Sequence, residues 1–243
     1  MEYYVRKHFS KYLVWRCQNE ICYLPYLGII YKIWRSDIFV YLDDVQYSNG
    51  YVFEWNRIKT PQGECRLKIP LEKKFGQLLT EVKPKDFLGW KEKHLKVVEM
   101  NYKRAPYFVE LFPLFSDVIY QKYDNLAELN IAMTEMFLEF FGLNEHNKRL
   151  RSSEMNISSQ SETRVIEIVK KLGGNVYISG TGAASYQNES HFASAGIELI
   201  YSDYHPLEYR QQWGCFLPNM SVLDFAMNEG HDVERLFRRV RGE

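Results

Sequence analysis

The sequence predicts an α/β protein with a Rossmann-like, mostly parallel sheet, a β excursion and an inserted helical subdomain. Short runs of β-favouring apolar residues alternate with helix-like segments in both halves of the chain, which is the order of βαβ units. Helical patterns alone occupy the stretch at about 87–142. We therefore expect one domain over residues 1–243, with a helical subdomain at about 87–142 between two α/β parts.

The composition fits a globular protein and argues against a general nucleic-acid binder. Hydrophobic residues make up 46% of the 243 residues, which is enough for a substantial core. The chain carries 31 basic and 31 acidic residues, whereas a nucleic-acid binder usually has a basic excess. The locally basic stretch Arg235–Arg241 is interpreted as the solvated face of a helix, or alternatively as a contact for an anionic partner.

The chain shows no targeting or metal-binding pattern. Charged residues interrupt Met1–Trp15, so no signal peptide is expected, and no apolar run approaches the ~20 residues of a membrane span. The four cysteines, at positions 17, 22, 65 and 215, lack the spacing of a zinc site. We expect a cytoplasmic protein with reduced thiols, no metal and no cofactor.

The N-terminal elements predict a βαβ start. Residues Tyr12–Trp15 are the first expected strand. Pro25 marks the following turn, and Leu27–Trp34 is an apolar helix. The next strand, Ile38–Leu42, is apolar throughout, which indicates burial on both faces of a parallel sheet. The chain contains neither a GxGxxG nor a GxxxxGK[ST] phosphate motif.

Two adjacent acids, Asp43 and Asp44, follow this strand. In open α/β sheets, ligands bind outside the carboxyl ends of the strands. One of the acids is therefore a candidate for holding a substrate amine or hydroxyl, or for acting as a base. The alternative is structural, with Asp43 capping the next turn and Asp44 solvated. Gln46, which follows, is a candidate for orienting an acceptor.

Residues Tyr47–Pro70 predict a β excursion. Its two arms, Tyr51–Phe53 and Cys65–Pro70, flank the turn signal in Thr60–Gly63. The polar residues of Lys73–Asp86 show no clear periodicity, so a loop is expected there.

A basic side chain lies on the first arm of this excursion. Arg57 stands beside Asn56, and a guanidinium next to an amide suits a carboxylate or a phosphate. Alternatively, Arg57 forms a structural bridge to Asp43 or Asp44.

The helical stretch predicts three helices: Trp90–Lys103, one that starts near Ala105 and runs toward Phe115, and Asn125–Phe141. His94 stands on or beside the apolar face of the first helix. It is interpreted either as a hydrogen-bonded core residue or as a catalytic base.

The second half returns to α/β alternation. A helix is expected over Ser161–Leu172 and a buried strand over Val176–Ile178. The loop Ser179–Ala184 is expected to open into a helix, where backbone N–H groups can bind an anion; a tight strand-to-helix turn is the alternative. After a further strand, Ile197–Tyr201, His205 is weighed equally as a site residue and as a structural residue.

The last helices are expected to begin near Ser221, which is a typical N-cap residue. Asp224, one turn later, repeats the capping pattern. We interpret this pair as structural.

Several motifs, in this order, resemble the WbqC-like protein family, which is found in bacterial O-antigen and other surface-polysaccharide gene clusters. The N-terminal part of the resemblance is carried by Tyr23–Gly28, Asp43–Tyr47 and Asn56–Lys59. A further match lies at Trp90–His94. Four more occur in the second half of the chain, at Ser152–Glu154, Tyr177–Gly180, Phe216–Asp224 and Asn228–Gly230. The family's early His-Gln-Pro falls on Asn19-Glu20-Ile21, or on Cys17-Gln18-Asn19 with an insertion, so its histidine is missing here.

The resemblance implies a transferase that moves a small acyl or aminoacyl group onto a biosynthetic precursor, such as a nucleotide sugar or a carrier-bound substrate. Candidate catalytic residues are Asp43, Asp44, His94 and His205. Candidate substrate-binding residues are Asn19, Glu20, Tyr23, Gln46, Asn56, Arg57, Ser153, Ser179, Gly180 and Tyr186. We expect these residues to converge at one cleft above one mixed sheet.

Two other functions remain open at this point. The βαβ start favours an enzyme that resembles nucleotidyltransferases and activates a carboxylate, and the missing family histidine favours a non-catalytic partner of a biosynthetic enzyme. Cys17 or Cys22 as a nucleophile would make the mechanism covalent, although either cysteine can simply pack. A small-molecule substrate is expected, such as a nucleotide sugar or a carrier-protein thioester.

Overall fold

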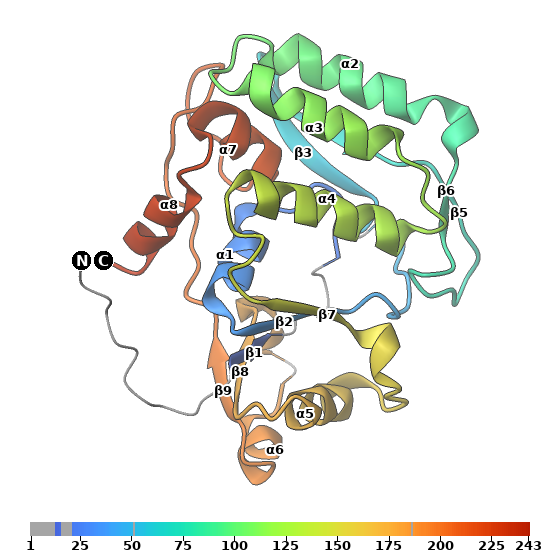
Figure 1. Ribbon diagram of the computed structural model, residues 1–243, viewed down its shortest axis with the longest axis vertical. Coiled ribbons are helices and arrows are strands. Elements are labelled where there is room, and N and C mark those ends of the chain that lie inside the picture. The colour runs from blue at the N-terminus through green and yellow to red at the C-terminus, as the bar shows by residue number, and fades with distance from the viewer. Residues whose placement is uncertain (1–12, 16–20, 51, 186) are drawn as a thin grey trace.

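The computed structural model describes residues 13–15, 21–50, 52–185 and 187–243 of the chain. Its centre is a five-stranded sheet in which every neighbouring pair is parallel, in the order β7-β2-β1-β8-β9 (Figure 1). The strands are β1 Leu13–Trp15, β2 Ile38–Tyr41, β7 Lys148–Arg151, β8 Val176–Ser179 and β9 Glu198–Tyr201. The prediction of an α/β protein with a parallel sheet is confirmed, and this sheet is parallel rather than mixed.

The sheet is buried on both faces because its strands alternate between two apolar clusters. On β2, Phe39 and Tyr41 pack into the larger cluster and Val40 into the smaller one. The smaller cluster is covered by α5 (Ser161–Lys171) and α6 (Glu189–Ser194), which lie below the sheet in Figure 1. The apolar run at residues 38–42 is therefore explained, as predicted, by burial on both faces of a parallel sheet.

The larger cluster joins the other face of the sheet to most of the remaining helices. It contains residues of α1 (Leu27–Arg35), of the helical stretch and of the C-terminal helices. These further helices are α2 Trp90–Tyr102, α3 Phe108–Tyr120, α4 Leu126–Phe140, α7 Val222–Glu229 and α8 Val233–Val240. Each predicted helix of the stretch 87–142 is present, and Asn125 caps α4 by accepting from the Glu128 N–H at 2.9 Å.

The β excursion is an antiparallel hairpin of β3 (Trp55–Thr60) and β4 (Gly63–Lys68), joined at the predicted turn. Its first arm differs from the expectation because β3 begins at Trp55, after Tyr51–Phe53; Tyr51 lies outside the described residues. Residues 73–86 also differ, since β6 (Lys83–Pro84) pairs there with β5 (Leu71–Glu72), ahead of a short 3-10 turn, η1 Asp86–Leu88. A two-residue strand is too short to leave a periodic pattern.

One local prediction in the second half is wrong, and another is confirmed only in part. The loop after β8 forms a 3-10 turn, η3 Thr181–Ala183, and α6 begins only at Glu189, so this loop does not open directly into an α-helix. Ser221 precedes α7 as expected, but its side chain makes no capping bond. The carboxylate of Asp224 instead accepts from the hydroxyls of Tyr102 and Tyr209, because tertiary partners replace the local cap.

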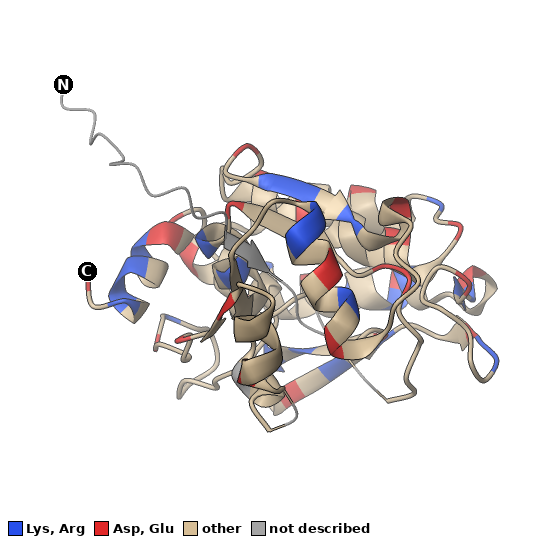
Figure 2. Cartoon of the chain, turned by 90° about the horizontal axis from the view of Figure 1, so that it is seen from below, with Lys and Arg blue, Asp and Glu red and all other residues tan. Residues whose placement is uncertain are grey.

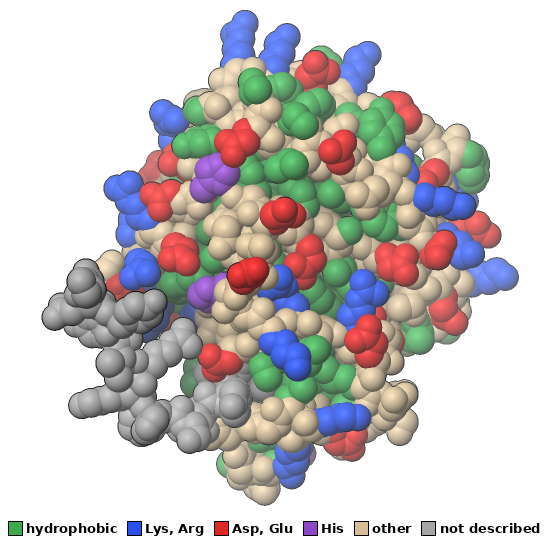
Figure 3. Space-filling view, in the orientation of Figure 1, with side chains coloured by type: hydrophobic (Ala, Val, Ile, Leu, Met, Phe, Trp, Pro, Cys, Tyr) green, Lys and Arg blue, Asp and Glu red, His purple; other side chains and the backbone are tan. Residues whose placement is uncertain are grey.

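The described residues show neither a membrane span nor a metal cluster. Among them, no helix combines the length and the apolar character needed to cross a bilayer. The same residues hold no group of three His, Cys, Asp or Glu side chains placed to bind a metal. Lys and Arg are interspersed with Asp and Glu over the molecule (Figure 2), and the face in Figure 3 shows the same mixture, in keeping with the balanced net charge.

Gly28, in the first turn of α1, is required by a close aromatic approach. A Cβ at this position would meet ring carbons of Tyr26 at 2.2 and 2.8 Å and one of Tyr204 at 3.0 Å. We predict that Gly28→Ala lowers the free energy of unfolding by about 1–3 kcal/mol, because the rings have to move. Gly182→Ala is the matched control, since nothing lies within 4 Å of its Cβ. Urea unfolding of both variants measures the difference, and equal losses would contradict the prediction.

Candidate functional site

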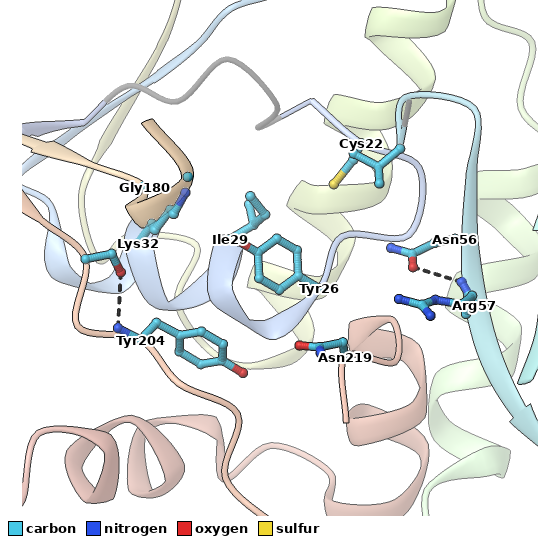
Figure 4. Close-up of a pocket in the computed structure, with 12 residues that line it drawn as sticks. Cys22, Tyr26, Ile29, Lys32, Asn56, Arg57, Gly180, Tyr204 and Asn219 are labelled. Carbon is cyan, nitrogen blue, oxygen red and sulfur yellow. Dashed lines mark hydrogen bonds between the residues drawn. The ribbon is translucent and has the colours of Figure 1, made fainter. Parts of the chain in front are cut away.

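A cavity of about 360 Å³ lies at the carboxyl edge of the sheet (Figure 4). Gly180 and Gly182, which follow β8, line it together with Ser202 and Tyr204, which follow β9. The chain order reverses between β1 and β8, because β2 and β7 extend the sheet from β1 while β9 extends it from β8. Crevices at such a reversal are the usual ligand sites of open α/β sheets.

Other walls of the cavity come from α1 and from the β3–β4 hairpin. Tyr26, Ile29 and Lys32 belong to the start and body of α1, and Asn56 and Arg57 to β3. The remaining lining residues are Cys22, Val52 and Asn219. Segments from both halves of the chain therefore meet here, and Figure 4 shows Arg57, Asn219 and Tyr204 along one side of the cavity.

The described lining is cationic. Lys32 and Arg57 are its two basic residues, and no aspartate or glutamate lines the cavity in the described part of the chain. Lys32 is only 3% exposed. Its side chain is therefore shielded from bulk solvent, and charges in such a place are less screened than at the surface.

Arg57 keeps donor capacity for a ligand. Its Nη1 donates to both carboxylate oxygens of Glu64, at 3.0 and 2.9 Å, in a solvent-accessible bridge along the hairpin. Its Nε is buried and has no partner among the described residues. Exposed bridges of this kind contribute little, so the bridge does not exclude binding of an anion by the same guanidinium.

Asn56 fixes the hairpin against the loop that precedes α1. Its Nδ2 donates to the carbonyl oxygen of Leu24 at 2.5 Å, and its Oδ1 accepts from the Arg57 N–H at 2.8 Å. The backbone of Leu24 has a left-handed φ of 49°. Such conformations persist where the surrounding structure enforces them, and they are common at functional sites.

Two tyrosines provide aromatic surface in the cavity. The rings of Tyr26 and Tyr204 meet edge to face, with their centroids 6.3 Å apart. Burial raises the pKa of Tyr204 well above its usual range, so this hydroxyl stays protonated at neutral pH. The backbone N–H of Tyr204 donates to the Ser202 hydroxyl at 3.2 Å, which orders the start of the segment after β9.

The sequence profile of the WbqC-like protein family matches residues 22–235, which is most of the chain. The chain belongs to the WbqC-like protein family. It is also similar to a Mycobacterium tuberculosis (strain ATCC 25618 / H37Rv) protein named "Uncharacterized protein Rv1507c", with 29% identity over 224 residues that cover 90% of this chain and 95% of the relative. No solved structure matches this WbqC-like chain.

Three of the predicted site residues line the cavity of this WbqC-like protein: Asn56, Arg57 and Gly180. Cys22, the alternative nucleophile, lines it as well and is buried. Ser179 is buried next to Gly180, and its hydroxyl has no partner among the described residues. Cys17, Asn19, Glu20 and Tyr186 lie outside the described residues. Cys17 and Asn19 are also the two positions onto which the missing family histidine would fall.

The two acids after β2 form a separate polar cluster. Asp43 is buried and accepts from the N–H and hydroxyl of Ser153, at 2.9 and 2.6 Å. Asp44 accepts from the Ser152 hydroxyl and from Arg164 Nη2, the latter at 2.5 Å. This cluster joins the ends of β2 and β7. A bridge from Arg57 to either acid is wrong, because Arg57 pairs with Glu64, and the idea of a solvated Asp44 is wrong because Arg164 and Ser152 cover it.

The two predicted histidines do not reach the cavity. His94 is 3% exposed, its Nδ1 lies 2.9 Å from the Tyr23 hydroxyl, and its ring meets Trp90 edge to face. His94 and Tyr23 thus belong to the core, as the structural alternative for His94 proposed. His205 is exposed beside its own backbone, with Nδ1 3.2 Å from the Asp203 carbonyl oxygen. Gln46 is exposed and bridges to Leu78.

The expectation of one cleft that gathers all candidates is therefore corrected. Asp44, His94 and His205 lie apart from the cavity, whereas Lys32, Tyr26, Tyr204 and Asn219 line it without having been singled out. One signal for Lys32 was present, since it is the only charged residue in the apolar run Leu27–Trp34. Asn219 lies in the family match Phe216–Asp224, which does not single it out, and Tyr204 lies in a segment without a periodic pattern.

Burial of His94 predicts a loss of stability in acid. Burial lowers the pKa of His94 from 6.5 to about 4, so the folded protein holds it neutral. The unfolded chain takes up the proton first as the pH falls below about 6.5, and the free energy of unfolding drops by about 3 kcal/mol between pH 6.5 and 4. Above pH 6.5 this contribution does not change.

His94→Gln tests this, because glutamine can keep a hydrogen bond to Tyr23 and does not titrate. We expect the urea-derived free energy of unfolding of this variant to fall less steeply between pH 6.5 and 4 than that of the wild type. Parallel pH profiles would contradict the assignment. His205→Gln, at an exposed position, should leave the profile of the wild type unchanged.

Proposed function

We propose that this protein is an enzyme that transfers a small acyl or aminoacyl group onto an anionic biosynthetic precursor, such as a nucleotide sugar, and forms an amide or an ester. The observation that supports it most is the cavity at the carboxyl edge between β1 and β8, with a lysine and an arginine in its wall. The transfer reaction itself is what the family resemblance implies. In that setting the enzyme acts on cytoplasmic precursors of surface polysaccharides.

We propose further that the sheet is Rossmann-like. Numbered along the chain within the sheet, the order β7-β2-β1-β8-β9 is 3-2-1-4-5, the order of a doubly wound nucleotide-binding sheet. The glycines after β8 leave room for a close approach of backbone to ligand, as a phosphate cradle requires. The sheet therefore supports a nucleotide-bearing substrate more than an uncharged one.

In this proposal each side of the cavity has a role. Arg57 and Lys32 bind the phosphate or carboxylate of the precursor. Their electrostatic attraction to the anion is stronger inside the cavity than it would be in water. Tyr26 and Tyr204 give apolar faces for a sugar or a base. Asn56 holds the hairpin, and thus Arg57, in place through Leu24.

The chemistry can proceed from an activated donor without a carboxylate base. A neutral acceptor amine attacks the carbonyl carbon of a thioester, the new C–N bond forms as the C–S bond breaks, and the thiolate leaves with the amine proton. A cationic side chain near the carbonyl oxygen stabilises the oxyanion. If Cys22 instead takes the acyl group first, its own thioester is the intermediate, and Cys22→Ser abolishes transfer.

A second candidate is carboxylate activation by nucleotidyl transfer, which the strand order also favours. The two candidates differ in the donor: a nucleoside triphosphate for activation and an acyl thioester for direct transfer. Isothermal titration with ATP and with acetyl-CoA distinguishes them. A protein that binds a nucleotide sugar but neither donor is a binding partner rather than an enzyme.

Arg57 is predicted to be the main anion-binding residue of the cavity. UDP-glucose titrated into the wild type should bind, and Arg57→Gln should raise its Kd at least about tenfold, as expected for loss of a charge-assisted hydrogen bond. Arg66→Gln is the matched control, since Arg66 pairs with Arg57 across the hairpin but is exposed and stacks on Trp55. Equal effects of the two variants, or no binding of UDP-glucose, inorganic pyrophosphate or ATP, would contradict the proposal.

A further inference from the structure

Lys59 is a buried lysine that no step of the proposed chemistry uses. It lies on β3 and is 1% exposed. Its Nζ donates to the carbonyl oxygen of Cys215 at 2.5 Å and lies 3.4 Å from that of Gly214. Burying an ammonium group costs free energy unless hydrogen bonds or an opposite charge compensate for the lost hydration. A buried lysine at this position therefore calls for a structural explanation.

A buried acid in the same region is Asp224, which lies on α7 and is fully buried. Its two carboxylate oxygens accept from the hydroxyls of Tyr102, at 2.7 Å, and Tyr209, at 2.8 Å. Tyr102 also accepts from the backbone N–H of Lys59 at 3.0 Å. Burial raises the pKa of Asp224, while the hydrogen bonds from the tyrosines and the charge of Lys59 lower it. One polar network thus joins β3, α2 and α7.

The network also holds the connecting segment, residues 202–220, which links β9 to α7 without a helix or strand. The side-chain amide of Gln211 closes a loop in it by bonding the backbone N–H and carbonyl of Leu217, at 2.9 and 3.0 Å. Trp213 and Asn219 have left-handed φ values of 64° and 61°. Asparagine adopts this region readily, whereas a bulky residue such as Trp213 does so only where the surroundings enforce it.

The same segment supplies two walls of the cavity. Tyr204 stands near its start and Asn219 near its end, and Figure 4 shows Asn219 between Tyr204 and Arg57. β3 holds this segment at two points: through Lys59 at Cys215, and through the Arg57 carbonyl oxygen, which accepts from the Ser221 N–H at 2.9 Å. Arg57 and Lys59 are two residues apart on one strand. The residue proposed to bind the anion and the residue that holds the connecting segment therefore belong to the same rigid element.

We propose that Lys59 is a positioning residue, which fixes the connecting segment through the carbonyl oxygens of Gly214 and Cys215 and thereby places Tyr204 and Asn219 at the cavity. The inference rests on the proposed function for what the cavity binds. Asp224 is linked to Lys59 through Tyr102, which accepts from the Lys59 backbone N–H and donates to the Asp224 carboxylate. Lys59 itself does not touch the ligand.

The test separates charge balance from positioning. Lys59→Met removes both the positive charge and the bonds to the carbonyls, whereas Lys59→Met combined with Asp224→Asn removes the bonds but leaves no buried charge uncompensated. For both variants we measure the thermal midpoint, hydrogen exchange of residues 203–219 without ligand, and the Kd for UDP-glucose. Lys96→Met, at an exposed position on α2, is the matched control.

We expect the double variant to regain most of the thermal stability that Lys59→Met loses. Exchange in residues 203–219 should stay at least about tenfold faster than in the wild type in both variants, and the Kd for UDP-glucose should stay at least about tenfold higher. If the double variant also restores exchange and Kd to wild-type values, Lys59 only balances Asp224 and the proposal is overturned. Should Lys59→Met fail to fold, the double variant alone decides.

Failure of this inference is distinct from failure of the proposed function. If the wild type binds no UDP-glucose, the proposed function is contradicted, and the exchange measurement alone decides whether Lys59 fixes the connecting segment. If exchange in residues 203–219 of the double variant is unchanged, the positioning role of Lys59 is overturned, whatever the binding result.

Discussion

The parallel pairing of β1 with β8 is the contact on which the rest of the structure depends. It joins residues 13–15 to residues 176–178, far apart in the chain, with Leu13 opposite Val176 and Trp15 opposite Ile178. Through it, the segment before α1 and the glycines after β8 come to the same edge of the sheet. Of the chain between β2 and β7, the β3–β4 hairpin and the residues just before it reach this edge, where Val52, Asn56 and Arg57 line the cavity.

The hairpin supplies one of the two described basic residues at this edge, Arg57. Asn56 bonds the backbone of Leu24, and the Arg57 carbonyl oxygen bonds the backbone N–H of Ser221, so the hairpin joins the N-terminal loop to the start of α7. Neither bond uses the Arg57 guanidinium, whose Nη1 pairs with Glu64 and whose Nε has no described partner. A strand that is fixed by other groups is well suited to present this cation to a ligand.

Local patterns predicted the elements well and the site only in part. The apolar run at residues 38–42 and the stripe of α4 depend on periodicity, so they were found with nearly correct bounds. Arg57 and Gly180 were also identified, because their neighbours or their place after a strand gave a local signal. His94 was misleading, since a histidine on an apolar helix face looks the same in sequence whether it packs or reacts.

The remainder could not be read from local sequence because it is made by tertiary contacts. Asp224 has the spacing of a capping residue, but two tyrosines from α2 and the connecting segment take its carboxylate. Asp43 and Asp44 have the position of site residues, yet serines after β7 satisfy them. Tyr204 and Asn219 reach the cavity from a segment without regular structure, whose path is set by Lys59 and Gln211.

The position of a bound nucleotide sugar in crystals grown with UDP-glucose tests the anion site most directly. We predict electron density for the diphosphate within hydrogen-bonding distance of the Arg57 guanidinium, between the β3–β4 hairpin and the glycines after β8. Density at the Asp43–Ser153 cluster instead, or anywhere outside the cavity, would contradict it.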